Sequence, residues 1–541
     1  MRSLVVALLV PSLLAAQSAA RVTPITTAEI DGHLRFLSSD LLEGRAPATR
    51  GGRLAAEYLA SQLRAFGLTP GLDTSYLQTV PIDVVTADRG TMHIAASDKA
   101  TATLKHPEDA VVWAGSAAPN SSAQGELIFV GYGATAPEYR WDDFKDVDVR
   151  GKVLLVLVND PPAPVAEPSL FGGKAMTYYG RWPYKFEEAE RRGAAGALII
   201  HTTEAAGYPW HTVVGSWGSG QRMLPRPHDA PPPLAFRGWI QDSTAMALLR
   251  QAGLDLAELR ARATRRDFRP VATGIAIDVN FKNSVDHLRS ENVIGLVRGS
   301  DPKLRDEYVI FTAHWDHFGI AAPVNGDSIY NGALDNASGT ADLLAIARAA
   351  VSAPAPRRSL LFVFVTAEES GLLGSKFFAE NPTVPVERLV ANLNVDGGNV
   401  LGRTRDLRVL GDTKSSLGPS LAAFIRPRGM RLSPEEHPER GYFYRSDHFS
   451  FAKVGVPSVS IGAGYDFVGR SKDWGVQQEE DYTAHRYHQP SDEYRPEFDL
   501  TGAVQLSEIV LGFGRMLANA AGVPTWNADA EFRAARKPIS E

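Results

Sequence analysis

The residues FTAHWDHFGI (311–320) and NGALDNASGT (331–340) decide how this chain folds. The first stretch continues an apolar run of β type and ends it in a His-Trp-Asp-His sequence (314–317). The second is rich in Gly and Asn and delivers Asp335 just before a segment with helical periodicity. Imidazole and carboxylate groups at the point where a buried strand gives way to a loop are what a metal site at a sheet edge requires. The stretch therefore predicts a strand end that carries metal ligands, with His314 and Asp335 as the first candidates.

Two later apolar strands also end in ionisable residues. The run Ser359–Val365 leads into Glu368 and Glu369, and the run Leu389–Val395 leads into Asp396. A single acid after a strand usually caps the following helix, but an ordered set at successive strand ends is typical of a functional site. We therefore expect these carboxylates to meet the ligands of the first strand at one edge of one sheet.

From Glu291 onward, strand-like apolar runs alternate with segments of helical periodicity. This alternation predicts an α/β fold with a mixed, mostly parallel sheet that helices flank on both faces. The expected strands are residues 292–297, 308–312, 359–365, 389–395, 407–410 and 458–461, and the expected helices are residues 338–350, 372–379, 416–425 and 503–517.

An N-terminal part and an inserted region complete the predicted organisation. Residues 27–67 show two helical patterns around a polar loop, whose Glu43 and Arg45 are expected to face solvent. A strand–helix–strand group then precedes the α/β part, and this β-rich α/β insert is expected to end near Val279. The predicted divisions are a signal peptide (1–20), a main domain (21–75 and 286–520), an inserted region (76–285) and a C-terminal tail (521–541).

Composition and charge argue against several kinds of site and partner. The formal net charge is −6 with both signs mixed along the chain, so no nucleic-acid partner is expected. Without cysteine there can be no disulfide or thiolate ligand, and any zinc site must use His, Asp and Glu. Residues 1–20 combine Arg2, an apolar run and small residues before a cut after Ala20 (or, as a rival, at Ser18), which predicts export to the periplasm or medium. No later run predicts a membrane span.

Six motifs occur in a fixed order along the chain. The motifs are HWDH (314–317), GALDNASG (332–339), TAEESGLLGS (366–375), LNVDGG (393–398), YRSDHFSFAKVGVPSV (444–459) and YHQPSDEY (487–494). The set and its order resemble those of the co-catalytic dizinc aminopeptidases, the family of bacterial leucyl aminopeptidase and aminopeptidase Y, to which glutamate carboxypeptidase is related. The resemblance covers residues 27–70 and 286–515 and implies the zinc exopeptidase fold. Residues from about 125 to 270 resemble the protease-associated domain that some members carry as an insert.

The resemblance implies a role for each candidate ligand. His314 and Asp396 would bind one zinc ion, Glu369 and His488 would bind the other, and Asp335 would bridge both. The chemistry agrees, because zinc takes imidazole and carboxylate ligands and a bridging carboxylate suits two ions about 3.5–4 Å apart. The resemblance also implies a cis peptide bond after the bridging Asp. The implied cofactor is therefore two Zn2+ ions, and the implied partner is a peptide substrate.

The implied reaction removes N-terminal residues from peptides through a metal-bridging hydroxide, with Glu368 as general base. Adjacent residues on an extended strand point to opposite sides, so Glu368 and Glu369 can serve one site only if a turn, consistent with Gly371, intervenes. Asp316 is expected to hold the ring of His314.

A loop further on resembles the substrate-pocket segment of the family. It contains Tyr444, Ser446, Asp447 and His448, and Tyr444 is a candidate donor to a tetrahedral oxyanion. The alternative is a packed turn before the apolar residues 449–451.

Other functions stay open at this level. A carboxypeptidase or dipeptidase of the same clan would need arginines that grip a terminal carboxylate, and the sequence does not place Arg445 or Arg470. Glutaminyl cyclase is a further relative, disfavoured by the complete ligand set and the insert. A non-catalytic binding protein on a peptidase frame is disfavoured by the intact ligands and Glu368. A glycosidase is disfavoured because the neighbouring acids Glu368 and Glu369 cannot easily flank a substrate from both sides.

Overall fold

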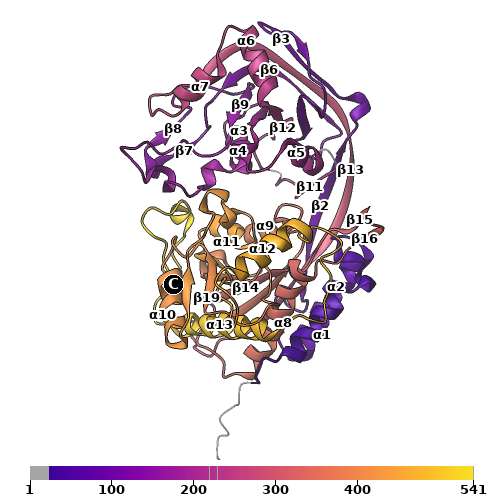
Figure 1. Ribbon diagram of the computed structural model, residues 1–541, viewed down its shortest axis with the longest axis vertical. Coiled ribbons are helices and arrows are strands. Elements are labelled where there is room, and N and C mark those ends of the chain that lie inside the picture. Colours follow the sequence, from indigo (N-terminus) through magenta and orange to yellow (C-terminus); the bar gives the residue numbers. More distant parts are fainter. Residues whose placement is uncertain (1–22, 218–219, 228, 540–541) are drawn as a thin grey trace, which may run out of the picture.

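The computed structural model describes residues 23–217, 220–227 and 229–539 and has two lobes stacked along its long axis (Figure 1). The smaller lobe is built by the elements from β3 (His93–Asp98) to α7 (Leu256–Ala263). The predicted signal peptide, residues 1–20, lies outside the described residues. In the described part of the chain, no helix is long and apolar enough to cross a membrane.

The sheet of the larger lobe is mixed, with parallel strands at its centre. β14 (Tyr308–His314) pairs in parallel with β17 (Ser359–Val365) on one side and with β18 (Leu389–Asn394) on the other. β18 pairs in parallel with β21 (Ser458–Ala463), and an antiparallel strand then follows on each flank. The prediction of a mixed, mostly parallel sheet is confirmed. The flanking strands are β13 (Val271–Val297), β19 (Asp406–Leu410), β20 (Arg431–Ser433), β1 (Thr69–Pro70) and β2 (Leu77–Ala87).

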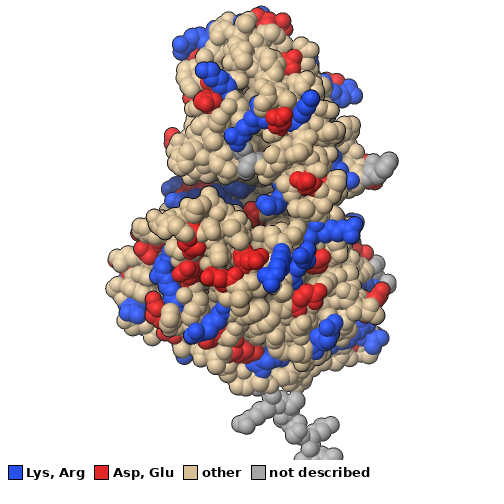
Figure 2. Space-filling model, turned by 90° about the vertical axis from the view of Figure 1, so that its right-hand side faces the viewer, with Lys and Arg blue, Asp and Glu red and all other residues tan. Residues whose placement is uncertain are grey.

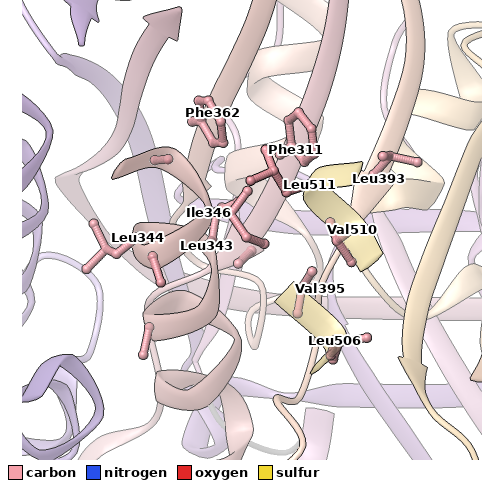
Figure 3. Packing of buried hydrophobic residues seen from close by; sticks show 14 of the residues in the cluster. Phe311, Leu343, Leu344, Ile346, Phe362, Leu393, Val395, Leu506, Val510 and Leu511 are labelled. Atoms are coloured by element: carbon pink, nitrogen blue, oxygen red, sulfur yellow. The ribbon is translucent and has the colours of Figure 1, made fainter. Parts of the chain in front are cut away.

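Side-chain alternation along the strands gives this sheet two apolar faces. On one face the rings of Phe311 and Phe362 stack with centroids 5.0 Å apart, and α8 (Gly339–Ser352) and α13 (Thr501–Asn519) pack nearby (Figure 3). Each large apolar side chain buried in this way contributes about 1.5–3 kcal/mol.

Further helices extend or cover these faces. Residues of α1 (Thr27–Leu37) and α2 (Arg50–Phe66) join the Phe311 face, while α9 (Leu373–Glu380) and α11 (His448–Lys453) cover the opposite one, where Ile310 is buried. The helical periodicity in residues 27–67 and in the α/β part was therefore interpreted correctly. The remaining helices of this lobe are α10 (Leu417–Ile425) and α12 (Trp474–His485).

The strand order explains where a site can form. From β14, the chain continues to β17 on one side and then crosses to β18 on the other. In an open sheet, the loops that leave the carboxyl ends of the strands separate at such a switch point and open a crevice. The residues that follow β14, β17 and β18 are therefore brought to one crevice.

The smaller lobe repeats this construction on a smaller scale. Its parallel strands β6, β9, β10 and β12 are extended by antiparallel partners, and helices cover the sheet. Its strands are β3, β4 (Ala102–Thr103), β5 (Ala110–Ala114), β6 (Asn120–Phe129), β7 (Thr135–Ala136), β8 (Trp141–Asp142), β9 (Val153–Leu157), β10 (Gly196–His201) and β12 (Phe236–Gln241). Its helices are α3 (Trp182–Arg191), α4 (Thr203–Ala206), α5 (Trp210–Trp217), α6 (Asp242–Gln251) and α7. The short β11 (Gln221–Met223) instead pairs with β2.

One strand connects the two lobes. β13 runs without a break past Val279, where the sequence had suggested that the insert ends. Its first half pairs with β3 and β6 in the smaller lobe, and its second half pairs with β2 and β17 (Figure 1). The apolar pattern of the first half reflects packing in the smaller lobe, which is why sequence alone suggested a boundary inside the strand.

The C-terminal residues are more than a tail. Trp526 and Phe532 are buried in a cluster that contains aromatic residues of both lobes, among them Tyr178 and Tyr444.

A hairpin of β15 (Gly319–Val324) and β16 (Asp327–Tyr330) forms a separate two-stranded sheet in the larger lobe.

Candidate metal centre

Strand ends and loops bring the candidate ligands together. His314 is the last residue of β14, Asp396 lies just beyond β18, and Glu369 follows β17. Asp335 lies in the turn before α8, and the Asp335–Asn336 peptide bond is cis, as the resemblance implied. His488 follows α12. The ligands expected from the sequence therefore come from the elements that end at the crevice.

The turn required between the two glutamates is present. Ala367 has a φ of 54° and Gly371 a φ of 99°, so the chain leaves the extended conformation directly after β17. The amide of Gly371 donates to the carbonyl of Glu368 at 2.9 Å, which closes the turn. Both glutamates can therefore face the same site, as the sequence argument required.

The candidate ligand atoms form two groups that share one carboxylate. His314 Nε2 lies 3.2 Å from Asp335 Oδ1 and 3.3 Å from Asp396 Oδ1. His488 Nε2 lies 3.2 Å from Asp335 Oδ2 and 3.4 Å from Glu369 Oε2. Asp335 thus offers one oxygen to each group, with a histidine and a second carboxylate on either side.

These spacings fit zinc. Bonds of about 2.0–2.1 Å in a tetrahedral arrangement place neighbouring ligand atoms about 3.3 Å apart. One ligand atom each from His314, Asp335 and Glu369 lies within 4.8 Å of the others. His488 Nε2 is buried and makes no hydrogen bond of acceptable geometry, although it is close to two carboxylates. An unsatisfied imidazole nitrogen facing carboxylate oxygens is what a metal ligand would show in the absence of its ion.

The electrostatics of the site also call for cations. Burial raises the pKa of Glu368 and of Glu369 well above the usual range, and the carboxylates around them add to that rise. Although burial alone would raise it, contact with His314 and His488 holds the pKa of Asp335 well below its usual range. Carboxylates packed this closely repel one another, and bound cations would relieve that repulsion.

Asp492 and His317 belong to neither ligand group but form hydrogen bonds with residues of these groups. The carboxylate of Asp492 accepts the amides of Leu334 and Asp335 at 3.0 Å and the hydroxyl of Tyr482 at 3.1 Å. His317 Nδ1 lies 2.7 Å from Glu369 Oε1. Asp492 thus fixes the turn that presents the shared carboxylate, a role that the sequence analysis missed although its motif included this residue.

Arg45 lies beneath the site, and the expectation that it faces solvent was wrong. Its side chain is fully buried and donates to the carbonyls of Trp315 (2.8 Å), Leu37 (2.6 Å) and Gly332 (3.0 Å), and also to that of Asn331. Burial lowers its pKa to about 10, while nearby carboxylates of the site counteract that effect. Its partners are backbone carbonyls far along the chain, which no local pattern reveals.

Asp316 contacts Glu368 more closely than the His314 ring. Its Oδ1 accepts the amide of Glu368 at 3.1 Å, whereas its distance to His314 Nδ1 is 3.8 Å. The carbonyl oxygen of Asp316 lies closer to that nitrogen, at 3.3 Å. Asp316 therefore positions the backbone of the expected general base, and it contacts the His314 ring mainly through its carbonyl.

The loop that resembles a substrate pocket is only partly at the site. Ser446 accepts a hydrogen bond from Asn394, the last residue of β18, at 2.9 Å. Asp447 and His448 are buried, and burial raises the pKa of Asp447 to about 7 and lowers that of His448 to about 3. The charges of His314 and Asp396 also act on Asp447. The hydrogen bond between Ser446 and Asn394 holds this part of the loop near the strand end that leads to Asp396.

Tyr444 points elsewhere, and Tyr487 takes the place expected for it. The Tyr444 hydroxyl donates to Glu531 and accepts from Lys414 at 3.1 Å, so it is already engaged. The ring of Tyr487 stacks on His488 with centroids 3.7 Å apart. Partial burial and the negative charges of Asp335, Glu369 and other site acids raise its pKa. The ring stacking thus puts Tyr487 beside the second ligand group. Its position next to a candidate ligand was the signal available in the sequence.

Two known peptidases are similar in sequence to part of this chain. Aminopeptidase NAALADL1 of Mus musculus is 37% identical over 130 residues, which are 23% of this chain and 16% of that protein. Leupeptin-inactivating enzyme 1 of Streptomyces exfoliatus is 28% identical over 159 residues, which are 28% of this chain and 34% of that protein. The chain thus matches only a minor part of the length of these relatives.

A solved structure covers more of the chain at lower similarity. The aminopeptidase from Aneurinibacillus sp. strain AM-1 aligns with 90% of this chain and 93% of its own, at 20% identity and a TM-score of 0.48. Residues 292–513 match peptidase family M28, and this range contains β14, β17, β18 and every candidate ligand. The part of the chain that contains the candidate ligands is therefore similar to peptidase family M28.

Proposed function

We propose that this chain is a two-zinc exopeptidase that removes N-terminal residues from peptides. The observation that carries the proposal is the pair of ligand groups that share Asp335, with Glu368 beside them and outside both. His314 and Asp396 would hold one ion with Asp335, and Glu369 and His488 the other. Zinc bound there would supply Lewis acidity toward a carbonyl oxygen and would make water nucleophilic at neutral pH.

Glu368 is the proposed general base. Its backbone is fixed by Asp316, and burial among other carboxylates raises the pKa of its side chain. A carboxylate oxygen of Glu368 would take the proton of the attacking water and pass it to the nitrogen of the leaving amine. The hydroxyl of Tyr487 would donate to the oxygen of the tetrahedral intermediate.

The acidic character of the site favours a substrate with a free N-terminus. Asp447 lies near the first ligand group without belonging to it, and its carboxyl would attract an α-ammonium group. An N-acetylated peptide lacks that charge. We therefore propose aminopeptidase over endopeptidase activity.

A second candidate, dipeptidase or carboxypeptidase activity, rests on two arginines. Arg181 precedes α3 in the smaller lobe, and its Nε is buried with no hydrogen bond in the described structure. Burial and the nearby charge of Arg445 lower its pKa to about 10. Arg445 lies just before Ser446 and Asp447, and a hollow between the lobes contains basic side chains (Figure 2). Two close guanidinium groups would bind the terminal carboxylate of a short peptide.

Matched peptides separate these activities. The purified, zinc-loaded chain would be assayed on a tripeptide with free ends, on its N-acetyl form and on its C-terminal amide. An aminopeptidase hydrolyses the free and amidated forms and spares the acetylated form. If only the C-terminal amide is left uncut, the chain has the second candidate activity, that of a dipeptidase or carboxypeptidase. Equal hydrolysis of all three peptides would contradict both candidates.

We also propose that the mature chain is exported and begins after Ala20, with the smaller lobe acting as a protease-associated domain inserted in the peptidase domain. The support for export is the order of a basic residue, an apolar run and small residues in the first 20 positions. N-terminal sequencing of the protein from the periplasm or the medium would show Arg21 first. A mature chain that begins with Met1 would contradict this assignment.

A further inference from the structure

Glu531, in the C-terminal segment, joins parts of both lobes. Its side chain is only 5% exposed. Oε1 accepts the amide of Tyr178 in the smaller lobe at 3.0 Å and also the hydroxyl of Tyr444 in the larger lobe. Oε2 accepts from Lys414 at 2.9 Å. Three separate segments of the chain therefore meet on one buried carboxylate.

Aromatic packing surrounds this carboxylate and keeps water away. The ring of Phe532 lies 6.1 Å from that of Tyr178, 5.8 Å from that of Phe449 and 6.2 Å from that of Trp526. The indole of Trp526 donates to the carbonyl of Gly455 at 2.8 Å. Hydrogen bonds to a charged group are worth more in such a dry setting than at the surface, so the contacts of Glu531 hold their partners firmly.

Two of the three partners of Glu531, Tyr178 and Tyr444, lead toward the substrate side of the proposed site. Tyr178 belongs to the segment that continues into Arg181 and α3. Tyr444 begins the loop that carries Arg445 and then Asp447 beside the first ligand group. The position of Glu531 therefore sets how the segment at Tyr178 faces the loop at Tyr444.

A second contact ties the same two segments together. Lys453 donates to the hydroxyl of Tyr178 at 3.1 Å and to Glu187 on α3 at 2.8 Å. This contact is more exposed, since the side chains of Lys453 and Glu187 are 34% and 35% exposed. The buried carboxylate of Glu531 is thus the stronger of the two connections.

We propose that Glu531 is a positioning residue that fixes the smaller lobe against the 444–447 loop and thereby shapes the binding of the peptide beyond its first residue. It touches neither the candidate ligands nor Glu368, so it acts on the fit of the substrate and not on the metal centre. The activity part of this proposal rests on the proposed peptidase function.

The test compares Glu531→Gln with Glu307→Gln. Glu307 is a matched control, because it also forms a buried pair, with Arg358, next to the start of β17. Glu531→Gln should raise KM for a tripeptide about 10-fold, the effect of losing charged hydrogen bonds, with little change in kcat. Zinc content and the hydrolysis of a single-residue chromogenic amide should stay as in the wild type.

Hydrogen exchange provides a readout that does not need activity. The amide of Tyr178 should exchange about 10-fold faster in Glu531→Gln than in the wild type or in Glu307→Gln. Tyr444→Phe, which removes one bond and keeps the ring, should give a smaller increase. Unchanged exchange at Tyr178, or an equal increase in the Glu307 control, would overturn the proposal. If the wild type shows no peptidase activity, the proposed function fails while the exchange comparison still decides the role of Glu531.

Discussion

Both lobes place polar residues at the carboxyl ends of parallel strands, but with different outcomes. In the smaller lobe, Asp160 after β9 accepts the amide and the hydroxyl of Thr177 at 2.8 and 2.6 Å. His201 at the end of β10 lies 3.0 Å from the carbonyl of Tyr208. In the larger lobe, the corresponding residues converge on Asp335 instead. A polar strand end therefore marks a site only where several such ends face one another without other partners.

The largest expected effect is on catalysis, and it concerns the strand ends of the larger lobe, where the candidate ligands converge. Glu368→Ala should lower kcat by about 1,000-fold, because the general base is lost, while zinc content remains unchanged. His201→Gln in the smaller lobe should leave kcat unaltered. Steady-state kinetics and metal analysis of the two variants measure the contrast. Comparable activity of Glu368→Ala and wild type would remove the proposed mechanism.

A large effect on stability is expected at Arg45, which lies beneath the candidate metal site. Arg45→Met would leave several buried carbonyls without a donor and should cost about 3 kcal/mol or more of unfolding free energy. Urea unfolding of the metal-free protein measures this directly. Arg50→Met, at an exposed position on α2, is the control and should change little. Equal stability of the two variants would mean that Arg45 does not hold the site.

A smaller effect on stability is expected at the strand ends of the smaller lobe, where each polar group has its own hydrogen-bond partner. Thr177→Val removes a hydroxyl donor from buried Asp160 and should cost about 1–3 kcal/mol. Zinc content should not change, since this edge holds no candidate ligand. A loss of zinc in this variant would show that the two edges are coupled, against the contrast drawn here.

The last expected effect depends on pH and concerns a buried acid outside the metal site. Asp342 on α8 is fully buried, its oxygens make no hydrogen bond in the described structure, and burial raises its pKa well above the usual range. A folded-state pKa above the unfolded value means that stability is greatest at low pH and is lost as pH rises. Above about pH 4, the free energy of unfolding of Asp342→Asn should therefore rise relative to that of the wild type. The rise should be at most about 1.4 kcal/mol per pH unit.

Thermal unfolding from pH 4 to pH 8 measures this difference. A stability gap between Asp342→Asn and the wild type that does not change with pH would contradict the prediction. The result matters for the comparison of the lobes, because a raised pKa at a position without converging partners would then mark a buried acid and not a site.

Sequence alone predicted what depends on local pattern and order. The strand ends at His314, Glu369 and Asp396 follow from apolar runs and the residues after them, and the structure brings them together as expected. The mixed sheet followed from alternating strands and helices. These features are encoded over short stretches, where side-chain periodicity fixes the element and its direction.

Features that depend on distant partners were not predictable in this way. Arg45 looks like a loop residue until carbonyls from three other segments surround it. Tyr444 and Tyr487 look alike in sequence, and only the fold directs one to Glu531 and the other to the ligands. Residues 521–541 looked like a tail because the partners of residues such as Trp526 and Glu531 lie far earlier in the chain.

The central claim is that two metal ions share Asp335. The most direct measurement is a crystal structure of the zinc-loaded chain with anomalous difference maps collected on both sides of the zinc absorption edge. The account predicts two zinc peaks, one bound by His314 and Asp396, the other by Glu369 and His488, with one oxygen of Asp335 on each. A single peak, or zinc bound without Asp335, would contradict it.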